Sequence, residues 1–537
     1  MSFWVTVAVA SGAGLLGILY LTGFFRRRRP NEPPLDKGLI PWLGHALHFR
    51  NDTMDFLQTM QKKHGDIFTA LIAGQYFTFL TDPLSFGGIV KEARNKLDFI
   101  SFAAELVLRV FRFEATHTTH KIIETSSTKH LKGEGLEVMT QAMMDALQAV
   151  LLRWQETSKE DPKSWKEDGL FHFCYNMVFR AGYLALYGTE PNGKQKEKSE
   201  QKDKQHSEEI FVEFRKYDKL FPRLSYALLT PSEWGQVKKI WNYFWEVLSV
   251  KNVYQKDNIS RWISDQSQQL AESGLSEEMR DRFMFLLLWA AQGNTGPASF
   301  WLLEYLMKHP KAMEEVRKEI EGVMKKSGQE MISRQKPLNV TREMLSQTPI
   351  LDSAVEETLR LATAPLLVRL VLEDMEFKLH NGKSYLLRKG DKIGLFPFLS
   401  AHMDPEIHAE PQAFKYDRFL SQNGSKKEFF KNGEKVKYFT MPWGAGTSMC
   451  PGRYFATNEI KLFAFMMLAC FDLELINQQE EIPAMNKTRY GFGVMQPMND
   501  VQFRSSSLSC LTWDIQPKFS PLLSQRVRKM GTASQGG

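Results

Sequence analysis

A long uncharged stretch lies near the N-terminal end of the chain. Phe3–Phe25 holds 23 residues without a charge, and at ~1.5 Å per helical residue this length can cross a bilayer. Four arginines, Arg26–Arg29, follow directly, and only Met1 and Ser2 precede the stretch. A cleaved signal peptide carries its positive charges ahead of the apolar stretch, so this order favours a retained single-pass transmembrane helix. A long buried core helix is the alternative.

Composition divides the rest of the chain. Residues 1–29 are expected to form the membrane anchor with its stop-transfer arginines, which leaves everything after them in the cytosol. Residues 30–46 are rich in proline, which cannot continue a helix, and are expected to form a stiff connector. Residues 47–516 are expected to fold as one domain, and the Ser-, Gly- and Arg-containing residues 517–537 as a flexible tail.

Helical periodicity dominates the folded part. The spacing of apolar residues predicts helices over Asp52–His64, Leu136–Trp154, Leu170–Leu186, Glu208–Leu220, Pro231–Val250, Asn258–Ala271 and Glu277–Lys308. Ile67–Leu80 is β-branched and aromatic with a central Ala-Gly, which predicts a hairpin. Thr189–Glu208 is almost wholly polar and predicts a solvated loop. We therefore expect a mainly α fold with small β-sheets.

Charge and cysteine content exclude several classes of protein. The 69 Lys and Arg residues against 62 Asp and Glu give a net charge of +7, and four of the cations stand in the single arginine block. This balance is too small for a nucleic-acid-binding surface, so we expect no nucleic-acid partner. The cysteines show no spacing typical of a zinc site or a disulfide framework, which favours a reducing compartment. They are Cys174, Cys450, Cys470 and Cys510.

One cysteine stands in a segment suited to chemistry. Cys450 follows a glycine-rich stretch that begins at Trp443 and precedes an apolar helix that starts near Tyr454. Glycines allow the backbone to approach a flat ligand closely, and the start of a helix favours an anion at the sulfur. Such a thiolate can ligate haem iron. The alternative is a buried free cysteine beside a turn, which is the commoner role of cysteine.

This loop resembles the haem loop of the cytochrome P450 family. The family has an aromatic residue seven positions before the cysteine, glycine four before and glycine two after, which Trp443, Gly446 and Gly452 match. The resemblance implies a cytochrome P450 fold and a haem b cofactor with Cys450 as the axial ligand of its iron. Two departures stand out: Trp443 replaces the usual Phe, and Ser448 replaces the usual basic residue.

Further matches occur in the family's order. Glu357 and Arg360 resemble the family's Glu-x-x-Arg helix, whose i, i+3 spacing puts both side chains on one face. Arg418 matches the later arginine that joins them, so the resemblance implies a buried structural lock. Arg369 lies where the family often places an arginine that binds a haem propionate. The usual Trp/Arg pair is absent, and Lys129, with its neighbours His130 and Lys132, is its expected replacement.

The oxygen side of the site is expected in the predicted helix that contains Gly293–Pro297. Glycine and proline are poor helix formers, so a local break is expected. The family usually has an acid followed by Thr here, and this chain has Asn294 and Thr295. An amide cannot shuttle a proton by ionising but can hold a water, so the resemblance implies a relay through Thr295 and water. An ordinary helix kink is the alternative.

Three longer strings narrow the resemblance to the sterol 12α-hydroxylases of bile-acid synthesis and their relatives, prostacyclin synthase and the sterol 7α-hydroxylases. The strings are Glu32–Ala46, Gln75–Phe79 and Gln292–Trp301. The resemblance implies an endoplasmic-reticulum monooxygenase that hydroxylates 7α-hydroxycholest-4-en-3-one at carbon 12. It would use O2 and electrons from NADPH, delivered by NADPH-cytochrome P450 reductase. The alternatives are an endoperoxide isomerase and a membrane-tethered sterol carrier without haem.

A sterol needs a large apolar cavity with a few orienting polar groups. We predict that its walls come from three parts of the chain: the oxygen-side helix, the segment Ala364–Val368 after the Glu-x-x-Arg helix, and a late turn, Phe492–Gln496. The expected substrate-binding residues are Trp289, Asn294, Ala364, Leu366, Val368, Phe492 and Gln496. Ordinary core packing is the alternative for each of them.

Overall fold

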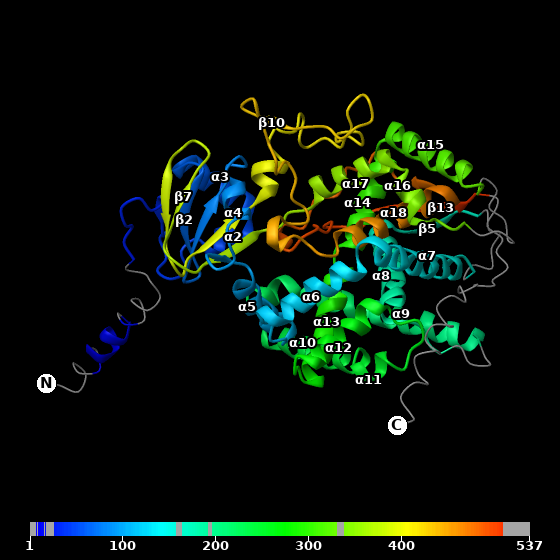
Figure 1. The fold of residues 1–537 in the computed structure, drawn as a ribbon, viewed down its shortest axis with the longest axis horizontal. Coiled ribbons are helices and arrows are strands. Elements are labelled where there is room, and N and C mark those ends of the chain that lie inside the picture. Colours follow the sequence, from blue (N-terminus) through cyan, green and yellow to red (C-terminus); the bar gives the residue numbers. More distant parts are fainter. Residues whose placement is uncertain are drawn as a thin grey trace, which may run out of the picture.

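The computed structural model describes residues 7, 9–15, 17, 26–156, 164–191, 196–329 and 338–508. A six-stranded sheet with α2, α3 and α4 lies at one end of the molecule, and the long helices form the other end (Figure 1). The helices are α2 (Ala46–Asn51), α3 (Thr53–His64), α4 (Phe86–Val90), α5 (Ile100–Phe111), α6 (His117–His130), α7 (Gly133–Glu156), α8 (Leu170–Tyr187), α9 (Lys196–Ser225), α10 (Pro231–Val247), α11 (Val250–Val253), α12 (Arg261–Glu272), α13 (Glu277–Gln292), α14 (Thr295–Lys308), α15 (Pro310–Lys326), α16 (Arg342–Ser346), α17 (Pro349–Ala362) and α18 (Arg453–Cys470). Short π and 3-10 turns are η1 (Phe398–His402), η2 (Gly446–Ser448) and η3 (Lys487–Arg489).

The strands form small sheets. The largest has the order β1-β2-β3-β9-β6-β4, and β12-β13-β5 form a second sheet. Two hairpins, β7-β8 and β10-β11, complete the strands. Their bounds are β1 (Leu35–Asp36), β2 (Ile67–Ile72), β3 (Gln75–Leu80), β4 (Leu97–Asp98), β5 (Lys166–Gly169), β6 (Leu367–Val371), β7 (Met375–Lys378), β8 (Ser384–Leu387), β9 (Lys392–Leu395), β10 (Phe430–Lys431), β11 (Glu434–Lys435), β12 (Phe471–Leu475) and β13 (Gln502–Ser507). The mainly α fold with small sheets is confirmed.

The predicted hairpin is present as β2 and β3. Ile67 pairs with Leu80, and Ile72 pairs with Gln75 across a two-residue turn. Ala73 and Gly74 both have positive φ there, +48° and +77°, as a tight hairpin turn with the twist of its strands requires. Adding a Cβ to Gly74 would put it 2.2 Å from the Trp42 indole nitrogen, so the connector packs closely on this turn.

Two helices form the centre of the helical part. Nearly every residue of α8 and all of α14 except Lys308 are buried, which is the pattern of a core helix apolar on all sides. α14 packs against α8, α17 and α18, so it is enclosed by helices on several sides. The segment predicted as one helix over Glu277–Lys308 is interrupted as expected, because α13 ends at Gln292 and α14 begins at Thr295.

The polar stretch expected to be a loop is largely helical, so that prediction is wrong. α9 begins at Lys196 and includes residues up to Ser207 that were assigned to the loop. The buried Ser207 hydroxyl accepts a 3.1 Å hydrogen bond from Arg180 of α8, and Asp203 accepts one of 2.8 Å from the Glu190 amide. Tertiary partners on α8 and the segment after it therefore satisfy side chains that looked solvated in the sequence.

The termini are only partly covered. Most of Phe3–Phe25 lies outside the described residues, and among the residues described no helix has the length and apolar character needed to span a membrane. The predicted tail, residues 517–537, also lies outside them. The proline-rich connector is docked on the large sheet, because β1 within it pairs in parallel with β2.

The structure brings the three charged residues of the predicted lock together. The Glu357 carboxylate accepts hydrogen bonds from Arg360 Nε at 2.7 Å and from Arg418 Nε at 2.8 Å. Arg360 also donates to the carbonyl oxygens of His402 and Pro411, at 2.6 and 2.7 Å. All three charged side chains are buried, so each charge depends on the others for partners. The lock ties α17 to the long segment before Cys450.

Replacing Glu357 by Gln should destabilise the fold. The change leaves two buried guanidinium groups without their shared anion, and breaking a buried pair from one side costs ~3–5 kcal/mol. Urea unfolding followed by circular dichroism would measure the loss. Glu356→Gln is the matched control on the same helix, because burial raises the pKa of the Glu356 carboxyl and so already favours its neutral form. Equal midpoints for Glu357→Gln and the unchanged protein would contradict the lock.

Candidate active site

Cys450 lies at the end of a tight loop just before α18. Its backbone N–H donates to the Trp443 carbonyl at 2.8 Å, and its carbonyl accepts from the Arg453 guanidinium at 2.9 Å. Gly446 has φ +63°, and a Cβ there would lie 2.3 Å from the Val90 carbonyl oxygen, so no other residue fits without displacement. The glycines therefore compact the loop and fix where the sulfur stands.

Among the described free cysteines, Cys450 differs in accessibility. Cys174 and Cys470 are fully buried, and burial raises the pKa of Cys470 to about 12, so both thiols are inert. Cys450 is only partly buried over its whole residue. Burial raises the pKa of its thiol too, but hydrogen bonds from the amides of Gly452 and Arg453 and the Arg453 charge act in the opposite direction. On balance the pKa of the Cys450 thiol stays above its ordinary value, and Cys450 is the one cysteine of the described part of the chain that is not fully buried.

The break between α13 and α14 has a specific chemical cause. In a continuous helix the Gly293 carbonyl would accept from residue 297, but Pro297 has no N–H to donate. The Tyr175 hydroxyl of α8 donates to the Gly293 carbonyl instead, at 3.3 Å. A side chain added at Gly296 would collide with the Tyr175 ring at 2.3 Å, so this glycine lets the tyrosine approach. The interruption is therefore held open by α8.

Thr295 and Asn294 sit at this break with different surroundings. Thr295 is 2% exposed, and its hydroxyl has no hydrogen-bond partner among the described residues. A buried unpaired hydroxyl is rare and marks a place for water or ligand. Asn294 accepts from the Val494 amide at 2.9 Å through Oδ1, which ties the break to the late turn. Only its amide nitrogen remains to hold a water.

The two predicted propionate-binding cations differ in the structure. Arg369 in β6 is buried and makes no ion pair in the described part of the chain; it donates to the Val368 carbonyl at 2.9 Å, and burial lowers its pKa to about 10. The Lys129 side chain is 65% exposed and pairs with Asp265 at 2.6 Å, so its charge is already compensated. His130 binds the same carboxylate at 2.8 Å.

Sequence reasoning missed two polar groups near the loop. Arg94 donates to the Thr447 carbonyl at 3.0 Å and so reaches the cysteine loop directly. His120 of α6 contacts the Phe99 ring, over which the Arg369 guanidinium lies at 5.3 Å from the centroid. Burial lowers the pKa of His120, which keeps it neutral at pH 7. Neither has a local sequence signal, because both depend on chain segments that meet only in the fold.

An aromatic wall surrounds part of the break. The Trp289 ring stacks on Phe221 of α9 at 4.3 Å and lies 5.5 Å from Phe111 of α5. Phe492 of the late turn meets Phe221 edge-on at 5.4 Å. The Trp289 indole N–H is buried and without a partner among the described residues. Two predicted wall residues, Trp289 and Phe492, therefore lie in one cluster.

The other predicted wall residues have mixed surroundings. Ala364 and Val368 are buried, Leu366 is half-buried, and Ala364 donates its N–H to the Gly493 carbonyl at 3.0 Å. Gln496 is buried and donates to Asp218 of α9 at 2.7 Å, so its amide is engaged with protein.

Comparison with known proteins decides the family. The cytochrome P450 family profile matches residues 33–503, most of the chain. The chain belongs to the cytochrome P450 family. The predicted fold and the haem cofactor of this family are thereby confirmed, with electrons supplied by a reductase.

Individual relatives of this P450 are also similar over most of its length. The 7-alpha-hydroxycholest-4-en-3-one 12-alpha-hydroxylase of Oryctolagus cuniculus is 50% identical over 491 residues, which cover 91% of this chain and 96% of that protein. Prostacyclin synthase of Homo sapiens is 42% identical over 478 residues, 89% of this chain and 94% of that one. The structure of retinoic acid bound cyanobacterial CYP120A1 superposes with a TM-score of 0.66 at 21% identity, covering 89% and 99% of the two chains, and shares the fold.

The residues of this P450 fit a haem. Cys450 offers a thiol on a residue that is only partly buried, and within the described ranges Arg369 is a buried cation without an ion-pair partner and Thr295 has an unpaired hydroxyl at a helix break. These are the donor, the counter-charge and the polar group that an anionic, iron-containing cofactor requires.

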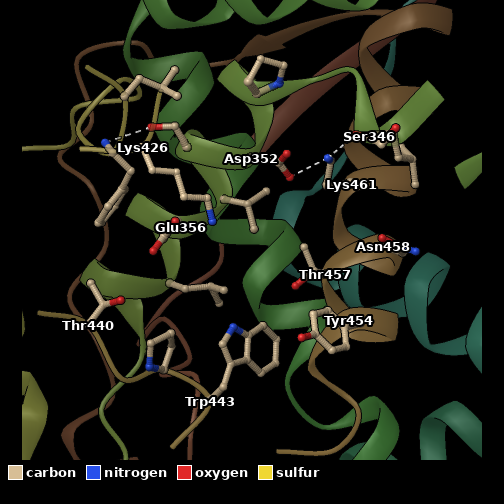
Figure 2. Close-up of a pocket in the computed structure, with 18 of the residues that line it drawn as sticks. Ser346, Asp352, Glu356, Lys426, Thr440, Trp443, Tyr454, Thr457, Asn458 and Lys461 are labelled. Carbon is tan, nitrogen blue, oxygen red and sulfur yellow. Dashed lines mark hydrogen bonds and ion pairs between the residues drawn. The ribbon is translucent and has the colours of Figure 1, made fainter. Parts of the chain in front are cut away.

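A cleft of ≈ 810 Å³ lies beside the cysteine loop (Figure 2). Trp443 and Tyr454 line it from the loop and the start of α18, and Glu356 lines it from α17. Asp352 and Lys461 form a 2.6 Å ion pair across it, drawn as a dashed line. The cleft thus joins the outer side of the cysteine loop to charged groups of both signs.

One buried acid was missed entirely. Glu459 of α18 is fully buried, and it accepts a hydrogen bond from the Gln292 amide at 3.4 Å. One carboxyl oxygen remains unpaired among the described residues, and burial raises the pKa of Glu459 to about 8. At pH 7 this acid is therefore mostly protonated, which explains how it tolerates an apolar site. It links the helix after Cys450 to the residue before the break.

Glu459 should make stability depend on pH. The unfolded carboxyl loses its proton near ~4.3, whereas the folded one keeps it to about pH 8. Between these values the folded state binds more protons, so the free energy of unfolding falls as pH rises, by at most ~1.4 kcal/mol per pH unit. Glu459→Gln should remove this contribution. Urea unfolding at a series of pH values tests the difference, and parallel curves for the two proteins would contradict it.

Proposed function

We propose that this P450 hydroxylates a sterol intermediate of bile-acid synthesis, 7α-hydroxycholest-4-en-3-one, at carbon 12. The observation that carries the proposal is the 50% identity, over 91% of the chain, to a protein with that activity in its name. The aromatic wall with one unpaired indole N–H supports it, because a flat apolar substrate with few polar groups needs such surroundings. O2, NADPH and NADPH-cytochrome P450 reductase would complete the reaction.

In this proposal each residue of the loop has a part in holding the haem. Bound haem supplies the iron chemistry that activates O2, and a thiolate ligand favours O–O cleavage. Cys450 would hold the iron through its sulfur, and Gly446 keeps the loop before it compact, while Gly452 lies at the start of α18 just after it. Arg369 binds a propionate, with Lys129 the weaker candidate because Asp265 already compensates its charge.

Thr295 and Asn294 would deliver protons. The Thr295 hydroxyl has no protein partner among the described residues, so it is available to hold a water at the break. Asn294 fixes the late turn through Oδ1 and offers its N–H2 to the same water. Since the amide cannot ionise, Asn294 would position the water, and the Thr295 hydroxyl together with that water would pass the protons.

The substrate would lie between the break and the aromatic wall. We propose that Trp289 donates its free indole N–H to a polar group of the sterol, while Phe492, Leu366 and Val368 contact its apolar faces. Ala364 shapes the cavity through the backbone. Gln496 acts indirectly, because its amide already binds Asp218.

Prostacyclin synthase is the second candidate function, supported by 42% identity to that enzyme. Rearranging an existing peroxide requires no reduction of O2 and no delivery of protons to it. The buried, unpaired Thr295 hydroxyl at the break therefore favours hydroxylation over isomerisation.

We also propose that Phe3–Phe25 anchors the protein in the endoplasmic-reticulum membrane, with the catalytic domain, residues 47–516, in the cytosol. Arg26, the first residue after this stretch, forms two hydrogen bonds to Asp391, at 2.5 and 2.7 Å, and lies over the Tyr76 ring. The chain would thus leave the bilayer at a fixed point of the large sheet. Extraction of microsomes with alkaline carbonate tests the anchor: release of the full-length protein would contradict it.

Replacing Cys450 by Ala should abolish the Soret band that is characteristic of a haem-thiolate protein. The reduced protein under carbon monoxide should show a red-shifted Soret band, and the variant should lose it because Cys174 and Cys470, the other cysteines that the structure describes, are buried in the core. Cys174→Ala and Cys470→Ala are controls, since both thiols are buried in the core, and Cys510→Ala is a further control. A normal band in Cys450→Ala would exclude this ligand and the haem-thiolate function with it.

Thr295→Ala should uncouple electron use from product formation. Without the hydroxyl, proton delivery becomes disordered, and more NADPH is consumed for each sterol hydroxylated. The measurement is that ratio in the reconstituted enzyme. Ser299→Ala is the matched control, because Ser299 is also buried on α14 with an unpaired hydroxyl. Unchanged coupling in Thr295→Ala would argue against the relay role of Thr295.

A further inference from the structure

A carboxylate lies fully buried in the middle of α9. Asp218 is 0% exposed and accepts hydrogen bonds from Arg489 Nη2 at 2.9 Å, Gln496 Nε2 at 2.7 Å and Arg215 Nη1 at 2.8 Å. Arg489 also donates from Nη1 to the Asp218 carbonyl oxygen at 3.1 Å. The carboxylate is thus bound by three side chains, two of which, Arg489 and Gln496, come from the segment that contains the late turn.

The cations of this cluster are themselves held in place. Arg489 is buried, and the Arg215 guanidinium lies over the faces of Tyr175 and Phe171 of α8, at 4.4 and 5.1 Å from their centroids. A buried carboxylate is tolerated only with such complete partnering. Three chain segments, α8, α9 and residues 489–496, therefore meet at one charge.

The late turn is fixed on its other side by the oxygen-side break. Between Arg489 and Gln496 lies the backbone that binds Asn294, through the Val494 N–H at 2.9 Å. Trp301 of α14 donates to the Met495 carbonyl at 2.7 Å. The late turn is therefore bound on one side to α9 and on the other side to Asn294 and to α14, the helix that carries Thr295.

Phe492 stands in the middle of this bracketed turn. Its ring meets Phe221, which is three residues after Asp218 on α9, at 5.4 Å, and meets Tyr226 at 5.7 Å. Phe221 in turn stacks on Trp289. The separation between α9 and the late turn consequently sets the distance between the Phe492 and Phe221 rings. It therefore also sets the space that the aromatic wall leaves beside the break.

We propose that Asp218 is a positioning residue that sets substrate orientation by latching α9 to the late turn through Arg489 and Gln496. The proposal rests on the proposed function of the site. Neighbouring carbons of a sterol are close together, and a displacement of ~1 Å at a reacting centre can change a rate ~100-fold. A small increase in the separation between α9 and the late turn would therefore let other carbons of the sterol reach the reacting oxygen.

The test uses full-length holoenzyme reconstituted with reductase and 7α-hydroxycholest-4-en-3-one, and the variant Asp218→Asn. Asparagine keeps the size but loses the charge and turns an N–H2 group towards the arginines. We expect an unchanged reduced carbon monoxide spectrum, a sterol KM raised about tenfold, and products hydroxylated at more than one position. A normal KM and a single product from Asp218→Asn would overturn the proposal.

Glu213→Gln is the matched control on the same helix. Glu213 lies nearly one and a half turns before Asp218, its side chain is 28% exposed, and it forms an ion pair with the exposed Lys216. This variant should keep the KM and the single product. Altered products from Glu213→Gln would show that any change of charge on α9 has the effect, and would overturn a specific latch.

Arg489→Lys keeps the proposal testable if Asp218→Asn does not fold. Lysine keeps the positive charge but cannot bind the carboxylate and the Asp218 carbonyl at once, so the product pattern should broaden in the same direction. Hydroxylation by Arg489→Lys identical to that of the unchanged enzyme would overturn the latch.

Hydrogen exchange separates the latch from the proposed function, because it needs no turnover. In Asp218→Asn, amides of residues 217–225 and 489–496 should exchange faster, while those of α17 stay protected. Exchange raised everywhere, or nowhere, would overturn the latch. Loss of sterol hydroxylation by the unchanged enzyme, with the local exchange difference intact, would instead count against the proposed function alone.

Discussion

A missing backbone hydrogen bond organises the active site of this P450. Pro297 cannot donate to the Gly293 carbonyl, and Tyr175 takes its place, so α13 and α14 are two helices rather than one. The arrangement of the polar groups at the break between α13 and α14 depends on that interruption. The Thr295 hydroxyl there has no partner in the part of the chain that the structure describes, and the Asn294 side chain accepts from the Val494 amide of the late turn while its carbonyl still accepts from Ala298 of α14. A continuous helix would satisfy its own backbone and leave no polar opening beside the aromatic wall.

Buried charge is handled in two ways around this opening. Glu357 and Asp218 each accept hydrogen bonds from guanidinium groups and so join segments far apart in sequence. Among the described residues, Glu459 accepts a hydrogen bond from the Gln292 amide alone, and its raised pKa leaves it mostly neutral at pH 7. The first arrangement ties α17 and α9 to later segments of the chain, and the second leaves Glu459 without a counter-ion among the residues that the structure describes.

The sequence predicted those parts whose signals are local. The glycines around Cys450, the proline after Gly293 and the i, i+3 pair of Glu357 and Arg360 each limit the backbone or the face on which a side chain lies. The hairpin of β2 and β3 followed from alternation and an Ala-Gly turn. The polar start of α9 was mistaken for a loop, because the partners of its side chains, such as Arg180, lie in an earlier helix.

Taken alone, the sequence determined the family, the cysteine loop and the interrupted helix, since steric limits of glycine and proline and the spacing of charged residues act within a few positions. Only the tertiary structure decided which polar groups are satisfied. It paired Lys129 with Asp265, left Arg369 without an ion-pair partner within the described ranges, and placed the Gln496 amide against Asp218 rather than in the cavity. Burial and hydrogen-bond partners arise from segments hundreds of residues apart, and no local pattern records which of them will meet.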